Sequence, residues 1–383
     1  MAETYTLPGH GLMIADAVRM DAYQAALERT VRPGCVVLDI GTGTGMMALM
    51  ACRLGARRVY AVDPGDAIHL ARAAARDSGF ADRIEFIQDL STRVRLPEHA
   101  DVIVSDLRGV LPVFQQHVPS LADARDRLLA PGGVLIPRAD TLRAAPVEAE
   151  AEHRRITAPW DEHARGFDLS AARRAALNGW SKAHVRREQL VAEPRTWAVL
   201  EYGTRRDPEV RGTLEWTVQR TATAHGFAVW FHAELVEGVG FTTGPEGPET
   251  IYGSGFFPWL EPVALREGDC VAVDLQAREM AADHVWVWNT VVRRTDGSRL
   301  EFRQSSFLSQ PSTPRDLRKR AHDFSPMLGE EGRIDRAVLE MMDGAATLEK
   351  IAREVQRRFP ERFRTWEEAL ARAGRLSQAY ADD

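Results

Sequence analysis

A chain of 383 residues, 44% of them hydrophobic and 27% charged, has room for two or three globular domains at roughly 100–200 residues each. The formal net charge of −6 argues against a nucleic-acid binder, because phosphate backbones are held by an excess of Lys and Arg. The three cysteines lack C-x-x-C spacing, which excludes a disulfide framework or a cysteine zinc site and suits a reducing compartment. We expect a cytoplasmic protein with no metal and no membrane partner, since we find no signal peptide and no run of about 18 apolar residues.

The first third of the chain predicts a parallel sheet covered by helices. Apolar residues at helical spacing predict a helix over residues 11–30. Short apolar runs then alternate with helical segments as far as Pro137, which is typical of a parallel sheet with helices on both faces. The predicted strands are 35–41, 57–63, 83–89, 100–106 and 134–137.

From about residue 141 the pattern changes to strands that alternate apolar and polar residues. Such strands, separated by Gly, Pro and Asp, predict an antiparallel barrel or sandwich. The segment 167–190 looks helical and interrupts these strands as an inserted arm. After residue 311 the chain becomes helical again, over 333–359 and 365–380. The antiparallel strands are predicted at 196–202, 211–220, 226–236, 270–278, 284–294 and 300–307.

The run "DIGTGTG", residues 39–45, predicts a turn that binds a nucleotide-like ligand. Its third glycine, Gly45, comes one residue earlier than the last glycine of a G-x-G-x-x-G dinucleotide motif, and Met46 stands in that glycine's place. The turn therefore suits a ligand without a pyrophosphate, namely an adenosine that carries an amino-acid arm. Asp63, at the end of the second strand, would accept hydrogen bonds from the ribose hydroxyls; the alternative is a helix-capping Asp before Pro64.

Six segments of the chain, in this order and spacing, resemble the protein arginine methyltransferase family over about residues 10–308. The resemblance implies a helix over the cofactor (1–30), a Rossmann-like domain that binds S-adenosylmethionine (31–140) and a β-barrel (141–310). It also implies a homodimer made by a helical arm at about 160–192; a helix pair that caps the barrel is the alternative. The segments are "MIADAVRMDAY", "VLDIGTGTG", "LGARRVYAVD", "DVIVSD", "ARDRLLAPGGVLIP" and "PVALREGD".

The resemblance also implies which residues bind S-adenosylmethionine and its product S-adenosylhomocysteine. Arg19 should bind the methionine carboxylate and Met13 should pack beside the sulfonium, unless Asp16 and Arg19 form only an exposed ion pair. Ser91 and Thr92 occupy the positions that contact adenine in the family. The cofactor-binding residues predicted are Met13, Arg19, Asp39, Gly41, Thr42, Gly43, Gly45, Asp63, Ser91 and Thr92.

The two loops that bind arginine in the family are altered in this chain. The family's Ser-Glu-Trp-Met-Gly-Tyr loop, with its second Glu, corresponds here to "SDLRGVLPVFQ", in which Asp106 and Gln115 replace the two glutamates and Arg108 replaces Met. The family's Thr-His-Trp loop becomes Thr-Ile-Tyr, ending at Tyr252. Burying a guanidinium is costly unless its charge is paired, so a cationic arginine acceptor is disfavoured.

These altered residues are the candidates for catalysis and substrate binding. We expect Asp106 to be the base or orienting group, and Gln115 or Tyr252 to hold the acceptor by hydrogen bonds. Arg108 either recognises a substrate carboxylate or pairs with Asp106 without contacting substrate. His117 is either a further base in the substrate site or a surface histidine.

The leading hypothesis is a methyltransferase that acts on a nitrogen or oxygen of a small molecule, amino acid or peptide. The alternatives are an arginine methyltransferase with a weakened clamp and a cofactor-binding pseudoenzyme or adaptor. A nicotinamide dehydrogenase is disfavoured by Met46 and by the helix that carries Arg19. The last unit, 311–383, resembles the small winged-helix-like modules of PqqD type, which hold leader peptides; a structural role is the alternative.

Overall fold

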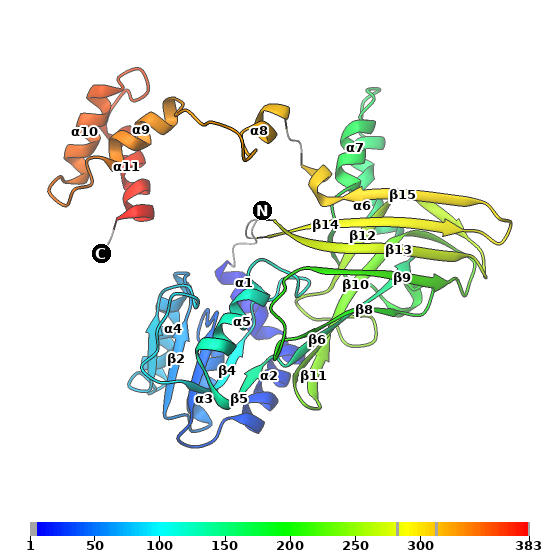
Figure 1. Cartoon of the computed structure of the whole chain (residues 1–383), viewed down its shortest axis with the longest axis horizontal. Helices are drawn as coiled ribbons and strands as arrows, with labels where there is room; N and C mark the ends of the chain where they lie inside the picture. Colours follow the sequence, from blue (N-terminus) through cyan, green and yellow to red (C-terminus); the bar gives the residue numbers. More distant parts are fainter. Residues whose placement is uncertain (1–5, 281–282, 311–312, 382–383) are drawn as a thin grey trace. The chain divides into compact units, whose positions relative to one another are not determined.

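The computed structural model describes residues 6–280, 283–310 and 313–381, and it forms two compact units, Met1–Pro311 and Ser312–Asp383 (Figure 1). The first unit begins with helices α1 (Leu7–Ala15) and α2 (Ala17–Thr30). The single helix predicted over 11–30 is therefore wrong. Asp16 has an extended ψ of 91° and ends α1, and its Oδ1 accepts a hydrogen bond from the backbone N of Arg19 at 3.0 Å, which caps α2.

A five-stranded sheet follows, with strand order β3-β2-β1-β4-β5 and every neighbouring pair parallel. The central strand β1 is buried along its whole length, which explains its uninterrupted apolar run. The predicted parallel sheet with covering helices is confirmed. The elements are β1 Val36–Ile40, α3 Met46–Arg53, β2 Arg58–Val62, α4 Ala67–Asp77, β3 Ile84–Ile87, β4 Ala100–Ser105, α5 His117–Arg127 and β5 Leu129–Ile136.

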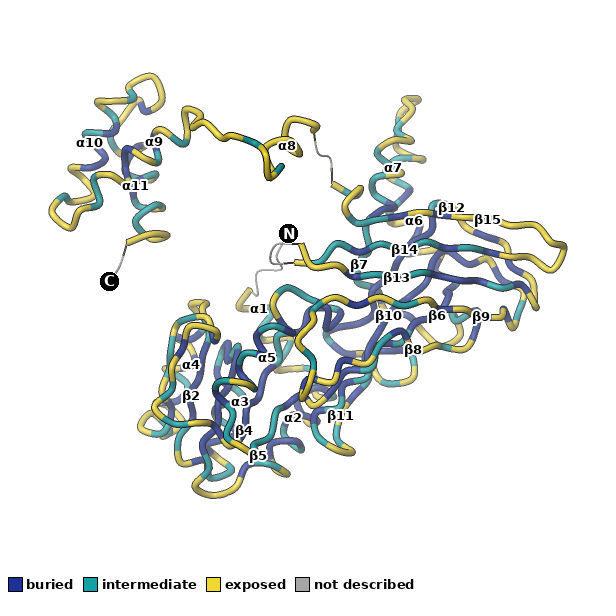
Figure 2. Tube along the Cα trace, viewed as in Figure 1, coloured by how far each residue is buried: buried dark blue, intermediate teal, exposed yellow. Residues whose placement is uncertain are grey.

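Two antiparallel sheets make up the rest of the first unit. One has the order β7-β12-β10-β6-β8, with β11 paired to β10, and the other has the order β15-β14-β13-β9. Figure 2 shows buried residues along the strands of both sheets, and one continuous hydrophobic core joins them to the parallel sheet. The strands are β6 Ala139–Val147, β7 Ser181–Ala183, β8 Arg195–Glu201, β9 Val210–Thr217, β10 Ala222–Val236, β11 Val239–Thr242, β12 Ser254–Leu265, β13 Cys270–Met280, β14 Asp283–Arg293 and β15 Arg299–Ser305.

A helical hairpin is inserted between β6 and β8. Helices α6 (Glu150–Asp161) and α7 (Ser170–Leu177) pack together, and α7 stands out from the sheets in Figure 1. The helix predicted over 167–190 is correct only for α7, because β7 and a short 3₁₀ turn at Arg187–Gln189 follow it. Gln304 of β15 connects the end of α7 to the sheet, because its Nε2 donates a hydrogen bond to the carbonyl oxygen of Leu177 at 2.6 Å.

The second unit contains the helices α8 (Pro314–Arg318), α9 (Glu330–Leu339), α10 (Leu348–Arg358) and α11 (Trp366–Tyr380). Side chains such as Ile334 and Ile351 pack α9 to α11 around a small core of their own. No strand occurs within residues 313–381, and the predicted likeness to leader-peptide modules stays a prediction. None of the helices in the described part of the chain has the length and apolar character to cross a membrane.

Candidate active site

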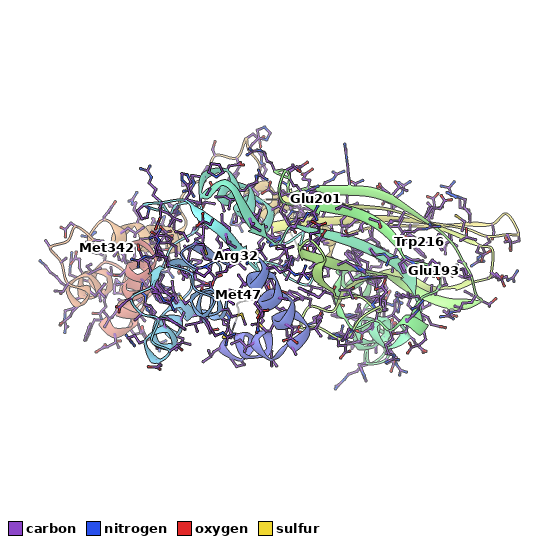
Figure 3. The ribbon with its side chains drawn as sticks, turned by 90° about the horizontal axis from the view of Figure 1, so that it is seen from below. Arg32, Met47, Glu193, Glu201, Trp216 and Met342 are labelled. Carbon is purple, nitrogen blue, oxygen red and sulfur yellow. The ribbon has the colours of Figure 1, made fainter. Side chains whose placement is uncertain are left out.

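A cavity of about 310 Å³ lies at the carboxyl ends of β1, β2 and β4, where ligands bind in sheets of this kind. Helix α1, the glycine turn, α3 and the loop after β4 all contribute to its wall; Met47 of α3 is labelled in Figure 3. The lining includes eleven of the predicted site residues, namely Met13, Arg19, Asp39, Gly41, Thr42, Gly43, Asp63, Ser91, Asp106, Gln115 and His117. The remaining four, Gly45, Thr92, Arg108 and Tyr252, are not in that lining.

The glycine turn needs its glycines for both conformation and space. Gly41, Gly43 and Gly45 have φ of 75°, 52° and 88°, in the left-handed region that other residues avoid. A Cβ on Gly41 would lie 2.5 Å from Cδ2 of Leu107, and one on Gly43 would lie 2.9 Å from Cε1 of His10. The turn therefore passes close to the α1 segment and to the loop after β4, so both segments lie against the cavity.

Two aspartates fix the turn. The carboxylate of Asp63 accepts hydrogen bonds from the backbone N of Gly43 at 2.8 Å and of Gly65 at 2.7 Å. Asp39 accepts from Oγ1 of Thr42 at 2.6 Å and from the backbone N of Ala48 at 3.1 Å, and burial raises its pKa to about 7. Asp39 thus joins the turn to α3. The hydrogen bonds to Asp63 fix its own carboxylate at the cavity wall.

Replacing Asp63 by alanine is expected to weaken binding of S-adenosylhomocysteine about 10- to 100-fold, since hydrogen bonds to a charged group contribute about 1.5–3 kcal/mol. Isothermal titration calorimetry measures the affinity. The matched control is Asp77→Ala at the exposed end of α4, which should bind as the unaltered protein does. Equal affinities for the two variants would refute the assignment of Asp63 to the ribose.

Asp106, which directly follows β4, accepts hydrogen bonds through both of its oxygens. Oδ2 accepts from Nε of Arg19 at 2.6 Å and from the hydroxyl of Tyr252, and Oδ1 accepts from Nη1 of Arg108 at 3.1 Å. Burial alone would raise the pKa of Asp106, but the charges of Arg19 and Arg108 outweigh it and lower the pKa below the ordinary value. Asp106 is therefore an ionised carboxylate held between two arginines.

Arg108 is completely enclosed, with 1% of its surface exposed. Its Nε and Nη2 bind the two oxygens of Asp140 at 2.7 and 2.9 Å, and Nη1 also donates to the hydroxyl of Tyr23 at 2.8 Å. The ion pair between Arg108 and Asp106, one of the two alternatives for Arg108, is present. The other alternative, a contact of Arg108 with a substrate carboxylate, stays a prediction. Asp140, at the start of β6, was missed by the sequence analysis, although a buried arginine requires such a partner.

His117 begins α5 and is 1% exposed, so the alternative of a surface histidine is wrong. Its Nε2 lies 3.0 Å from the hydroxyl of Tyr202, which donates in turn to Oδ2 of Asp140 at 2.6 Å. Burial lowers the pKa of His117 to about 3, so its ring is neutral. Tyr202, which follows β8, is a second residue that the sequence analysis missed. Gln115 lies in the loop between β4 and α5, two residues before His117, and has a φ of 41°.

The N-terminal helices and the loop before β12 close the other side of the site. Oδ2 of Asp16 accepts a hydrogen bond from the backbone N of Ile251 at 2.7 Å. Arg19 is 6% exposed, so the alternative of an exposed Asp16–Arg19 ion pair is wrong. Tyr252 stacks on Phe241 with ring centroids 5.9 Å apart, which directs its hydroxyl to Asp106.

Comparisons with known proteins agree with this architecture. Residues 24–154 match the family model of ribosomal protein L11 methyltransferase, and residues 138–293 match that of the arginine methyltransferase oligomerization subdomain. The chain is 32% identical over 284 residues to protein arginine N-methyltransferase 2 of Mus musculus, covering 70% of this chain and 63% of that protein. It is 31% identical over 255 residues to protein arginine N-methyltransferase 6 of Xenopus tropicalis, covering 63% of this chain and 75% of that protein.

A solved structure shows the same fold. It is the Trypanosoma brucei PRMT1 enzyme–prozyme heterotetrameric complex with AdoHcy, with a TM-score of 0.70 and 23% sequence identity. The match covers 79% of this chain and 98% of that chain. The predicted order of a Rossmann-like domain followed by antiparallel sheets is confirmed.

Proposed function

The chain belongs to the protein arginine methyltransferase family, whose members are S-adenosylmethionine-dependent methyltransferases, and we propose that it methylates an uncharged nitrogen or oxygen of a small molecule, amino acid or peptide. The observation that carries this proposal is the ion pairing of Asp106. Its oxygens already accept hydrogen bonds from Arg19, Tyr252 and Arg108. The negative charge of this carboxylate is therefore paired before any substrate guanidinium enters.

The charges around Asp106 balance without a substrate. Arg19 and Arg108 carry two positive charges, and Asp106 and Asp140 carry two negative charges. A guanidinium entering this end of the cavity would add an unpaired charge to a buried site, which is costly. The other carboxylates in the lining, Asp39, Asp63 and Asp89, belong to the ends of β1, β2 and β3, on the side of the glycine turn.

The side of the cavity at the glycine turn suits S-adenosylmethionine, which supplies an electrophilic methyl group on its sulfonium sulfur. We assign Asp63 to the ribose, Ser91 and Thr92 to the adenine, and Met13 to the sulfonium. Nε and Nη1 of Arg19 have partners, whereas its outer nitrogen Nη2 has none within residues 6–280, 283–310 and 313–381. We therefore assign Nη2 as the donor to the methionine carboxylate.

The substitution Gln115→Glu tests the acceptor class, because it restores the second carboxylate of the family's arginine clamp. We expect this variant and the unaltered protein to leave arginine-rich peptides unmethylated, since Asp106 remains occupied by Arg108. Transfer of labelled methyl from S-adenosylmethionine to such peptides measures this, and unchanged binding of S-adenosylhomocysteine verifies that the variant is folded. Methylation of the peptides by Gln115→Glu would favour the arginine methyltransferase with a weakened clamp.

We also propose that the chain forms a homodimer through the hairpin of α6 and α7. Its support is the match of residues 138–293 to the oligomerization subdomain, together with Phe167 between the two helices, 74% of whose surface is exposed. Multi-angle light scattering gives the mass in solution. The substitution Phe167→Glu should lower that mass to the value of one chain, and a single-chain mass before substitution would refute the dimer.

A further inference from the structure

We propose that His117 is the catalytic base, and that its Nδ1 receives the proton of a hydroxyl or amide-type N–H group on the methyl acceptor. This inference rests on the proposed methyltransferase function and narrows its substrate class. It combines three observations on one side chain. His117 lines the cavity, its Nε2 is fixed by Tyr202, and its Nδ1 is buried without a partner in the described part of the chain.

The hydrogen bonds around Tyr202 determine which nitrogen of His117 carries the proton. The hydroxyl of Tyr202 has one proton, and it donates that proton to the carboxylate of Asp140, which can only accept. The oxygen of Tyr202 must therefore accept the hydrogen bond from His117, so Nε2 carries the ring proton. In a neutral ring Nδ1 then has a lone pair and accepts hydrogen bonds.

Nδ1 of His117 is enclosed and has no hydrogen-bond partner among the described residues, and His117 borders the cavity. A buried polar atom without a partner costs about 1–3 kcal/mol, so such atoms in native proteins require an explanation. Gln115 and Asp106 line the same cavity as His117 and belong to the same loop region after β4. A donor group on the acceptor would satisfy Nδ1 and be held beside the predicted substrate residues.

The proton balance limits the acceptor to groups that become strong acids on methylation. The acceptor's lone pair forms the new bond to the methyl carbon, and the electron pair of the broken carbon–sulfur bond stays on sulfur. The acceptor's proton passes to Nδ1 and from there to water. A methylated hydroxyl or protonated amide loses its proton even to a weak base such as buried His117, whereas a simple amine does not.

Burial and the charge of Arg108 oppose a positive charge on His117, whereas the carboxylate of Asp106 favours it. The Nε2–H bond of His117 leads through the hydroxyl of Tyr202 to the carboxylate of Asp140, an arrangement that orients an imidazole and stabilises its protonated form. Tyr202 is a positioning residue in this scheme, because it acts through His117. If His117 were only structural, its hydrogen bond from Nε2 to Tyr202 would be sufficient to join α5 to β8, and replacing the nitrogen at Nδ1 would have no effect on the reaction.

The substitution His117→Gln separates the two roles. A glutamine amide can donate to Tyr202 as Nε2 does, but it places no basic nitrogen at Nδ1. We expect methyl transfer from labelled S-adenosylmethionine into an extract of the source organism to fall about 100-fold or more. The melting temperature and the affinity for S-adenosylhomocysteine should stay unchanged. The matched control is His153→Gln, because His153 is also buried, binds the carbonyl oxygen of Trp259 through Nε2 at 3.0 Å, and is outside the cavity lining.

The outcomes are distinguishable. Unchanged transfer by His117→Gln would overturn the role of His117 and leave the proposed function intact, whereas absence of transfer by the unaltered protein would overturn the proposed function. Should His117→Gln fail to fold, Tyr202→Phe decides. That variant keeps the imidazole, but the ring proton is no longer fixed on Nε2 by a hydrogen bond to Tyr202. We therefore expect transfer to fall about 10-fold at unchanged cofactor affinity. Full transfer would overturn the inference.

Discussion

Replacing Asp140 by asparagine is expected to lower the free energy of unfolding by about 3–5 kcal/mol, the usual cost of removing one partner of a buried ion pair. Asp140 has no exposed surface, and its two oxygens accept two hydrogen bonds from Arg108 and one from Tyr202. An asparagine keeps only one oxygen, and its NH₂ group would face the guanidinium. Arg108 would then be an enclosed charge that has lost its bidentate carboxylate partner. Urea unfolding followed by circular dichroism measures the loss.

The matched control for this variant is Glu234→Gln. Glu234 also pairs with an arginine, Arg138, but the two side chains are 41% and 52% exposed. Exposed pairs contribute about 0–1 kcal/mol, so the control should lose little stability. The double variant Asp140→Asn with Arg108→Met removes both charges and should recover part of the loss. A loss for Asp140→Asn no larger than that of the control would contradict a stabilising buried pair between Arg108 and Asp140.

Replacing Asp106 by asparagine is expected to lower the rate of methyl transfer about 100- to 1,000-fold, the size of effect seen when one preorganised hydrogen-bonding group is removed from an active site. The carboxylate of Asp106 holds both Arg19 and Tyr252. Arg19 is assigned to the methionine carboxylate of the cofactor, and Tyr252 lies at the predicted acceptor end. An asparagine removes the carboxylate charge that pairs with both Arg19 and Arg108. The initial rate with labelled S-adenosylmethionine and cell extract measures the change.

The control for Asp106→Asn is Asp274→Asn on β13, where the carboxylate accepts a hydrogen bond only from Gln276 among the described residues. That variant should transfer methyl at the rate of the unaltered protein. The affinity for S-adenosylhomocysteine shows how Asp106 acts. If affinity falls much less than the rate, Asp106 acts mainly on the transferring group, whereas an unchanged rate would remove Asp106 from the reaction altogether.

The parallel half of the fold could be predicted because its signals are local. Each strand is a short apolar run, and the glycine turn after β1 has a spacing that restricts the ligand. The break at Asp16 was missed, since the apolar spacing continues through it and only the capping hydrogen bond to Arg19 separates α1 from α2. Helix over 178–190 was predicted wrongly for a different reason. Strand β7 pairs with β12, and a pairing so distant in sequence leaves no local pattern.

The candidate site was predicted where a single loop carries it and missed where distant segments meet. Asp106, Gln115 and His117 are close in sequence and line one cavity. Asp140 is 32 residues beyond Arg108, and Tyr202 is 85 residues beyond His117, so no spacing rule connects them. The substitution of Arg for Met at position 108 was the only signal, because a fixed positive charge in a buried loop requires a carboxylate from elsewhere.

The chemical identity of the methylated product tests the proposed acceptor class most directly. The protein is incubated with labelled S-adenosylmethionine and an extract of the source organism, the products are hydrolysed enzymatically, and the label is identified by chromatography and mass spectrometry. We expect label on an oxygen or amide-type nitrogen of an uncharged group and none in methylarginine. Label that coelutes with methylarginine would contradict the conclusion that the balanced charges around Asp106 exclude a guanidinium.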